Sequence, residues 1–278
     1  MMAAMALLRS SLRPLQTFCI IIAASAIATG GCVARGRLEG RASDQWTRRY
    51  TVAAGGEFQI VGGNGTIEVE ASSGPEIDVD AERVGHASTD AAAAEIASRI
   101  RVNEDVSPDR VVLREDGLGG VIVGVETEVN FHVRVPAGLK VRLHTSNGRI
   151  TVSGVEGNIV ASTTNGAFSG KRLTGGVEVR GTNGNVNVDL ARVTTAPVEL
   201  RTTNGVIVLA LPQDANANVD ASVTNGSIDI QNLPLERSGE QTNRRVRGRL
   251  NQGGTPIQLT TVNGSVRLSA STAPGTAQ

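Results

Sequence analysis

Aromatic residues and cysteine are scarce in this sequence, and neither sign of charge is in excess. Only 2% of the 278 residues are Phe, Trp or Tyr, and 27 basic residues balance 27 acidic ones. Nucleic-acid binding relies on basic stripes and on aromatic platforms for the bases, so this composition argues against a nucleic-acid partner. Residues 1–31 contain Arg9 and Arg13 and no acid, so without them 25 basic residues face 27 acidic ones, a net charge of −2.

The two cysteines, Cys19 and Cys32, do not form the framework of a disulfide-rich protein. Cys19 lies within the apolar run of residues 18–28, FCIIIAASAIA, which follows a basic segment. A basic start, a short apolar run and small residues are typical of an export signal, and the run is too short to span a bilayer. Cleavage after residue 31 would leave Cys32 as the single cysteine, so no intramolecular disulfide is expected.

The residues at the expected cleavage point, Thr29-Gly30-Gly31-Cys32, resemble a bacterial lipobox. The resemblance implies that Cys32 receives a lipid and anchors the mature protein in a membrane. Thr29 departs from the usual aliphatic residue, so plain secretion or a periplasmic location is the alternative. Val33 is not the Asp that commonly retains lipoproteins in an inner membrane, which favours an outer-membrane or cell-surface location.

Changes in composition predict the organisation of the remaining chain. Residues 89–101 are rich in Ala and place Ile96 and Ile100 on one face, which predicts one short helix. The expected segments are a signal peptide at 1–31, a polar tether at 32–48, an N-terminal β region with the helix at 49–139, a β-repeat region at 140–270 and a disordered tail at 271–278.

A recurring Asn-Gly pair is the strongest internal signal. The predicted structural turns are Asn64-Gly65, Asn147-Gly148, Asn165-Gly166, Asn183-Gly184, Asn204-Gly205, Asn225-Gly226 and Asn263-Gly264. From Asn147 onward the intervals are 18, 18, 21, 21 and 38 residues, and the last is close to two periods. Self-similarity at a fixed period is typical of a repeat fold.

Each period is predicted to contain two short strands and two turns. Alternation places Val, Ile and Leu inward and Thr, Arg, Glu and Asp outward. Because Asn-Gly is also the favoured type I′ hairpin turn, an antiparallel β-sandwich meander is the alternative. We favour an all-β fold built as a single-stranded β-solenoid, because its coils would stack the Asn side chains in hydrogen-bonded ladders while Gly adopts the left-handed conformation.

Several passages, taken in order, extend this prediction to a family. They are YTVAAGGEFQIVGGNGTIEVE, VNFHVRVPAGLKVRLHTSNGRITVSGVEGNIVASTTNG, LPQDANANVDASVTNGSIDI and GGTPIQLTTVNGSVRLS, and they cover about residues 50–270. Together they resemble the bacterial adhesin family known as domain of unknown function 4097. The resemblance implies a β-helical domain behind an export or lipoprotein signal, and it brings no catalytic residues.

The three histidines, His86, His132 and His144, do not have the spacing of metal ligands. Strand alternation places His132 and His144 outward, where they could be neighbours on a solvated face. No metal and no cofactor is therefore expected, and the sequence also contains no phosphate loop or dinucleotide fingerprint.

Two pairs of adjacent acids, Glu104-Asp105 and Glu115-Asp116, are the candidate glycosidase carboxylates. A glycosidase needs two carboxyl groups held across a cleft, and adjacent residues in turn-like contexts do not predict that arrangement. We therefore expect a non-enzymatic adhesion, binding or structural module of the cell envelope, with a polysaccharide or an envelope protein as partner. A polysaccharide-active enzyme is the alternative, since β-solenoids also host such enzymes.

Overall fold

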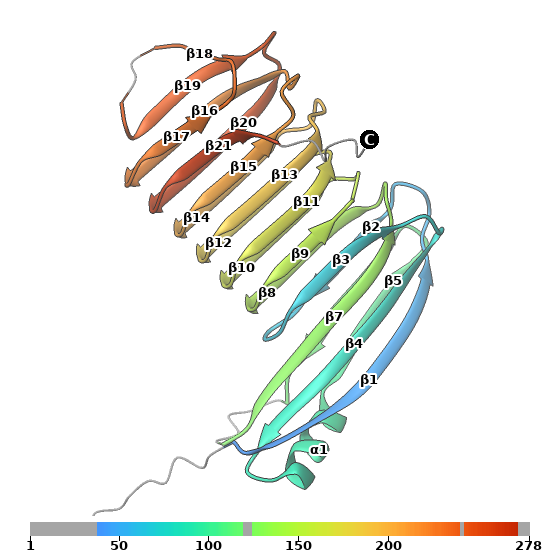
Figure 1. Cartoon of the computed structure of the whole chain (residues 1–278). Coiled ribbons are helices and arrows are strands. Elements are labelled where there is room, and N and C mark those ends of the chain that lie inside the picture. The colour runs from blue at the N-terminus through green and yellow to red at the C-terminus, as the bar shows by residue number, and fades with distance from the viewer. Residues whose placement is uncertain (1–37, 119–123, 240–241, 272–278) are drawn as a thin grey trace, which may run out of the picture. The chain divides into compact units, whose positions relative to one another are not determined.

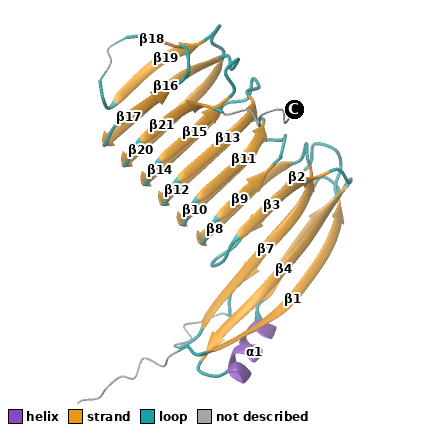
Figure 2. Cartoon of the chain, viewed as in Figure 1, coloured by secondary structure: helices purple, strands orange, loops and turns teal. Residues whose placement is uncertain are grey.

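The computed structural model describes residues 38–118, 124–239 and 242–271. The expected signal peptide, Cys32 and residues 272–278 of the expected tail lie outside these ranges. Strands dominate the described chain, and α1 is the single helix within it (Figure 2). This helix has ten residues, and no helix in the described ranges has the length and apolarity needed to cross a membrane.

The elements follow one another as β1 (Gly40–Thr51), β2 (Glu57–Val61), β3 (Ile67–Ser72), β4 (Glu76–Ala87), α1 (Asp90–Arg99), β5 (Arg101–Ser107), β6 (Arg110–Asp116), β7 (Glu126–Pro136), β8 (Lys140–Asn147), β9 (Ile150–Ser153), β10 (Ile159–Asn165), β11 (Phe168–Thr174), β12 (Val177–Asn183), β13 (Val186–Arg192), β14 (Val198–Asn204), β15 (Ile207–Leu211), β16 (Ala217–Asn225), β17 (Ile228–Gln231), β18 (Leu235–Arg237), β19 (Arg245–Leu250), β20 (Thr255–Asn263) and β21 (Val266–Ala270).

These strands form two sheets (Figure 1). Sheet A has ten strands in the order β1-β4-β7-β3-β9-β11-β13-β15-β21-β17, and sheet B has eleven in the order β18-β19-β16-β20-β14-β12-β10-β8-β2-β6-β5. The repeated strands pair in parallel, and antiparallel pairing is confined to the strands near the two ends of the sheets. The all-β prediction is therefore confirmed.

Each coil of the repeat contributes one strand to each sheet, with the Asn-Gly pair between them. In sheet B, β10, β12 and β14 pair with Asn165, Asn183 and Asn204 in register, and in sheet A β11, β13 and β15 pair in the same order. A hairpin turn would join neighbouring strands of one sheet, and a type I′ turn would need positive φ at Asn. Arg172, Asn232 and Asn251 are the non-glycine residues with positive φ in the described chain, so the solenoid prediction is confirmed over the hairpin meander.

The order of the coils in space differs from their order in sequence. The last coil in sequence, β20/β21, lies between β14/β15 and β16/β17. After β16/β17 the chain forms β18 and β19, which pair antiparallel, and it then returns to fill the position beside β14. The 38-residue interval is therefore one coil and a hairpin, and reading it as nearly two periods was wrong.

The repeat also begins earlier in the chain than residue 140. β2 and β3 form a first coil, because β2 pairs in parallel with β8 in sheet B and β3 with β9 in sheet A. The elements β4, α1, β5, β6 and β7 are inserted between this coil and the next. The Asn-Gly pair at residue 64 thus belongs to the same stack as the other six.

The core consists of the side chains that point between the two sheets. Val, Ile and Leu occupy these inward positions, as the alternation predicted, and Phe58, Phe131 and Phe168 are the largest fully buried side chains. At about 25 cal/mol for each Å² of buried apolar surface, this long core is the main stabilising contribution.

The expected polar tether at 32–48 is wrong from residue 40 onward. Residues 40–51 form β1, which pairs with β4 along its whole length at the edge of sheet A. Only Trp46 and Tyr50 of this strand are large buried side chains, and the residues between them are polar. An edge strand of such composition resembles a linker in sequence, which explains the error.

The predicted helix is present, although residue 101 belongs to β5. Its N-cap is Thr89, whose side-chain oxygen accepts a hydrogen bond from the backbone nitrogen of Ala92. Ile96 and Ile100, which were predicted to share one face, are both buried. A Cβ at Gly85 of β4 would overlap the backbone of the helix, so this glycine allows α1 to lie close to the strand.

Candidate functional site

The Asn side chains of the seven corners form one continuous ladder. Each amide nitrogen donates to the side-chain oxygen of the preceding Asn at 2.7 or 2.8 Å, in the spatial order Asn64, Asn147, Asn165, Asn183, Asn204, Asn263 and Asn225. At the N-terminal end, the Asn64 amide donates to the carbonyl oxygen of Thr127 at 3.2 Å. The structure therefore brings together all the structural turn residues predicted from the sequence.

The glycines of the corners are needed mainly because neighbouring coils approach closely. A Cβ added at Gly148, Gly166 or Gly205 would overlap the carbonyl oxygen of the corner glycine in the adjacent coil. These three glycines do not have the left-handed φ values expected from the sequence, whereas Gly184 has a φ of +154°. The predicted left-handed conformation is thus wrong for Gly148, Gly166 and Gly205. At these positions glycine is needed because a side chain would not fit between the coils.

Buried threonines reinforce the same corners from inside. Thr163, Thr202 and Thr261 lie two residues before a ladder Asn and point into the core. Their hydroxyls donate to the carbonyl oxygens of corner glycines in the adjacent coils, at 3.3, 3.0 and 3.0 Å. A buried hydroxyl needs such a partner, so these residues are structural and not available to a ligand.

A second set of hydroxyls faces solvent beside the ladder. We call it the hydroxyl row, and it consists of the residue that precedes each ladder Asn in five coils: Ser146, Thr164, Thr182, Thr203 and Thr224. The four threonines are exposed, and Val262 occupies the same position in β20. Because neighbouring strands lie about 4.8 Å apart, a similar polar group recurs at that interval along sheet B.

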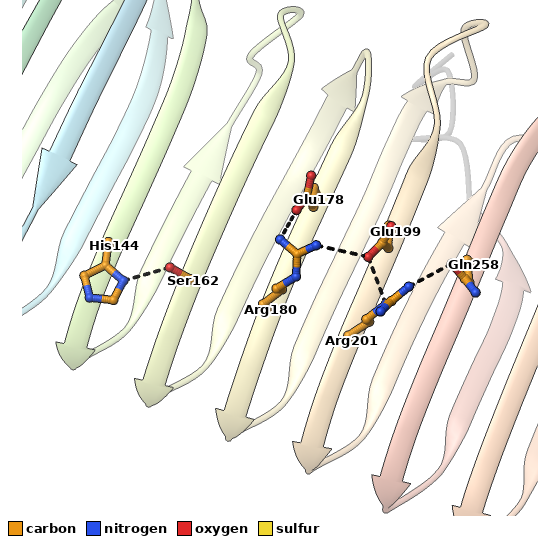
Figure 3. A network of polar contacts seen from close by, with 7 residues as sticks. All are labelled: His144, Ser162, Glu178, Arg180, Glu199, Arg201 and Gln258. Atoms are coloured by element: carbon orange, nitrogen blue, oxygen red, sulfur yellow. Dashed lines mark hydrogen bonds and ion pairs between the residues drawn. The ribbon is translucent and has the colours of Figure 1, made fainter.

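Ion pairs cross the outer face of sheet B next to this row (Figure 3). Arg180 contacts Glu178 of its own strand and Glu199 of β14, the latter at 3.5 Å. Arg201 contacts Glu199 at 2.8 Å and donates to Gln258 of β20 at 3.1 Å. Exposed pairs of this kind contribute at most about 1 kcal/mol each, so they orient the guanidinium groups more than they stabilise the fold.

Arginines also gather at the far end of sheet B, which the sequence reasoning missed. Arg245, Arg247 and Arg249 alternate along β19 and point to the same side. Asp220 contacts the first two at 3.4 and 2.8 Å, and Glu236 contacts Arg249 at 2.6 Å. The period of two in NRRVRGRL is the signal that could have identified this face.

The predicted proximity of His132 and His144 is wrong, because β7 lies in sheet A and β8 in sheet B. His132 Nδ1 lies 3.6 Å from Glu68 Oε2, and His144 Nδ1 lies 2.8 Å from Ser162 Oγ (Figure 3). His86 Nε2 lies 3.9 Å from Glu128 Oε2. Within the described ranges, no group of three or more His, Cys, Asp or Glu side chains is placed to hold a metal ion.

The acid pair Glu104-Asp105 is engaged in contacts at the edges of the sheets. Glu104 accepts a hydrogen bond from the Tyr50 hydroxyl at 2.7 Å and forms an ion pair with Arg48 at 3.1 Å. Burial raises the pKa of Tyr50, and Glu104 raises it further. Asp105 points elsewhere and lies 3.6 Å from Arg110. Glu104 thus links β5 to β1, and Asp105 links β5 to β6 within the hairpin that these two strands form.

Glu115 of the second acid pair supports the first corner. Its Oε2 accepts a hydrogen bond from the Gly63 nitrogen at 2.6 Å. Burial raises the pKa of Glu115, while backbone hydrogen bonds from Gly63 and Asn64 lower it. Asp116 accepts from Asn103 at 3.4 Å and takes no part in this contact. Neither acid pair therefore forms two carboxyl groups facing a common cleft.

A small hollow on sheet A contains more acids than the sequence reasoning identified. It has a volume of about 260 Å³, and its lining includes Glu68, Asp80, Glu82 and His132. Each acid contacts another side chain: Glu68 pairs with His132, Asp80 with Thr47 at 3.0 Å and Glu82 with Arg41 at 3.4 Å. The alternation of acids in IEVE and IDVDAE could have located this hollow.

Comparison with solved structures gives distant similarity. A "putative cell adhesion protein" from Clostridium sporogenes is 11% identical over 83% of this chain and 100% of its own, with a TM-score of 0.47. A "putative adhesin" from Bacteroides fragilis is 13% identical over 82% and 97%, with a TM-score of 0.30. A "putative lipid binding protein" from Parabacteroides distasonis is 12% identical over 82% and 97%, with a TM-score of 0.31.

No curated protein matches the sequence. The family model described as Toastrack DUF4097 matches residues 65–269, which is most of the chain and includes all the ladder corners except Asn64. This match confirms the resemblance inferred from the order of the sequence passages. The chain belongs to the Toastrack DUF4097 family.

Proposed function

We propose that this protein is a binding module of the bacterial envelope, with an extended polysaccharide as its ligand. One observation carries the proposal: along the Asn-Gly ends of the sheet B strands, the Asn ladder places an exposed amide at every coil, and the hydroxyl row adds a hydroxyl in five of them. Hydroxyls and amides both donate and accept hydrogen bonds, as sugar hydroxyls do. A polymer lying along the coils would meet a new polar group about every 4.8 Å.

Affinity at such a surface would come from many weak contacts. The one Trp and the one Tyr of the sequence are buried on β1, so they provide no stacking platform for a sugar ring. Each exposed hydroxyl would contribute less than about 1 kcal/mol, and several contacts to one chain would add through their high effective concentration. Long polymers should therefore bind, and short oligosaccharides of the same composition should bind weakly.

We further propose that lipid attached at Cys32 anchors the module at the outer membrane or cell surface. The support is the resemblance of residues 29–32 to a lipobox and the basic and apolar segments before it. An envelope protein is the competing ligand, since a flat polar face also suits protein contacts.

The experiment compares two triple variants of the mature chain against cell-wall and capsular glycans and against envelope proteins. Thr164→Ala, Thr182→Ala and Thr203→Ala together should abolish glycan binding, while each alone has little effect. The matched control changes outward residues of sheet A in three neighbouring coils: Thr151→Ala in β9, Ser169→Ala in β11 and Asn187→Ala in β13. Equal binding by the two triple variants, or binding to protein alone, would refute the glycan proposal.

Polysaccharide cleavage is the second candidate, and the acidic hollow on sheet A is the observation that favours it. A carboxylic acid and a carboxylate there would be needed to break a glycosidic bond. If the protein hydrolyses a glycan and Glu68→Gln, Asp80→Asn or Glu82→Gln abolishes that reaction, the enzyme proposal replaces the binding proposal.

A further inference from the structure

The Asn-Gly pairs are chemically labile, and the hydrogen bonds between stacked coils counteract this lability. In such a step the backbone nitrogen of Gly can attack the side-chain carbonyl carbon of Asn, and the missing Cβ leaves that approach open. In six corners the Gly nitrogen instead donates to the carbonyl oxygen of the next coil's Asn, at 2.9 or 3.0 Å: Gly65, Gly148, Gly166, Gly184, Gly205 and Gly264. This hydrogen bond holds the proton on the nitrogen and directs the nitrogen toward the next coil.

The seventh corner, Asn225-Gly226, lacks this protection. Its coil is the last in the stack, so no further ladder Asn lies beyond it to accept from the Gly226 nitrogen. The following segment contacts the corner on either side, where Arg244 accepts from the Val223 nitrogen at 2.8 Å and Asn243 from the Ile228 nitrogen at 3.2 Å. Within the described residues, the Gly226 nitrogen donates to no acceptor.

The side chain of Asn225 is also less restrained than those inside the ladder. Its amide nitrogen donates to Asn263 at 2.8 Å, but among the described residues its oxygen accepts no bond from a further coil. Asn183, by comparison, donates to Asn165 and accepts from Asn204, both at 2.8 Å. Both reacting groups at the last corner are therefore restrained less than at an interior corner.

We propose that Asn225-Gly226 is a site of spontaneous deamidation in the folded protein, and that the other six pairs are protected. The Gly226 nitrogen loses its proton and forms a bond to Cγ of Asn225. The bond from Cγ to Nδ2 breaks, and the leaving amide takes up the proton and departs as ammonia. One water molecule then opens the resulting succinimide at either carbonyl, which leaves aspartate or isoaspartate at this position.

The reaction changes the end of the stack and spares its interior. The new carboxylate cannot donate to the side-chain oxygen of Asn263, so the last link of the ladder is lost. Isoaspartate also adds a methylene to a backbone that packs closely against the adjacent corner, where a Cβ at Gly226 would overlap the carbonyl oxygen of Gly264. The coil β16/β17 should consequently loosen first as the protein ages.

The test incubates the purified protein in mildly alkaline buffer, with and without urea, and maps the products by peptide mass spectrometry and isoaspartate methylation. The folded protein should react at Asn225 at least about tenfold faster than at Asn183 or Asn204, and the unfolded chain should react at all seven pairs at comparable rates. Asn225→Ser should remove the signal of the folded protein. Comparable rates at interior corners of the folded protein, or no reaction at Asn225 where the unfolded chain reacts, would overturn the proposal.

Discussion

The side-chain amide of Asn263 donates to the side-chain oxygen of Asn204 at 2.8 Å, although 59 residues separate them in sequence. Their strands, β20 and β14, are direct neighbours in sheet B. This contact closes the ladder across the position that the chain skips on its way to β16. The regular surface of the solenoid thus depends on a coil that is inserted last in sequence order.

Steric exclusion at the corners gives a direct prediction for stability. Gly166→Ala should lower the free energy of unfolding by about 3 kcal/mol, because the new Cβ would overlap the carbonyl oxygen of Gly148. Gly138→Ala is the matched control, since no atom of the described structure lies within 4 Å of its added Cβ. Urea unfolding measures both. Equal midpoints for the two variants would show that close approach does not fix glycine at the corners.

The position of an Asn within the ladder should determine how much its replacement lowers the free energy of unfolding. Asn183→Ala removes two side-chain hydrogen bonds and should lower the free energy of unfolding by about 1 kcal/mol. Asn225→Ala removes one hydrogen bond and should lower the free energy of unfolding by about half as much. Thermal unfolding at neutral pH measures the difference. A larger loss for the terminal variant would contradict the ladder as a set of independent links.

The raised pKa of Glu115 predicts a pH dependence of stability. The folded protein holds this proton more tightly than the unfolded chain, so the stabilisation is complete below the ordinary Glu pKa of about 4.3 and is lost as pH rises through the raised value. Glu115→Gln keeps an oxygen toward Gly63 and removes the titration. The variant should therefore gain stability relative to the parent protein as pH rises through this window.

Melting temperatures between acidic and neutral pH provide the measurement for Glu115. Glu70→Gln is the control, because Glu70 is exposed on β3. Curves for the parent protein and Glu115→Gln that stay parallel over the whole range would rule out the assigned role.

The lipid anchor is tested by the two cysteines. Cys32→Ser should move the protein from the membrane fraction to the soluble fraction, since it removes the proposed acceptor of the lipid. Cys19→Ser should leave the membrane association intact, because Cys19 lies within the segment expected to be cleaved. Fractionation of cells that express each variant decides the matter, and a Cys32→Ser protein that stays in the membrane contradicts the anchor.

The corners and the inward faces were predictable because their causes are local and repeated. Asn147, Asn165 and Asn183 recur at 18 residues, and the strands between them alternate with a period of two. The helix was equally readable, from its Ala content and the apolar spacing of Ile96 and Ile100. Each of these features follows from backbone geometry over a few residues.

Other features depend on neighbours that are distant in sequence. β1 is a strand because β4 pairs with it, although its own composition resembles a linker. His132 and His144 lie in different sheets because the chain crosses from sheet A to sheet B between β7 and β8. The role of Glu115 follows from the position of Gly63, 52 residues earlier. No local pattern contains this information.

The sequence by itself determined that the chain folds into stacked β coils with Asn at one corner, because one residue type at a fixed period can satisfy its amide only against its own repeats. The order of the coils was decided by tertiary structure. The strands β16 and β20 present nearly the same alternation and the same Asn, so either could pair with β14 in register. Which of them does so depends on the β18–β19 hairpin, whose pairing with β16 fixes that strand away from β14 and leaves the gap that β20 fills.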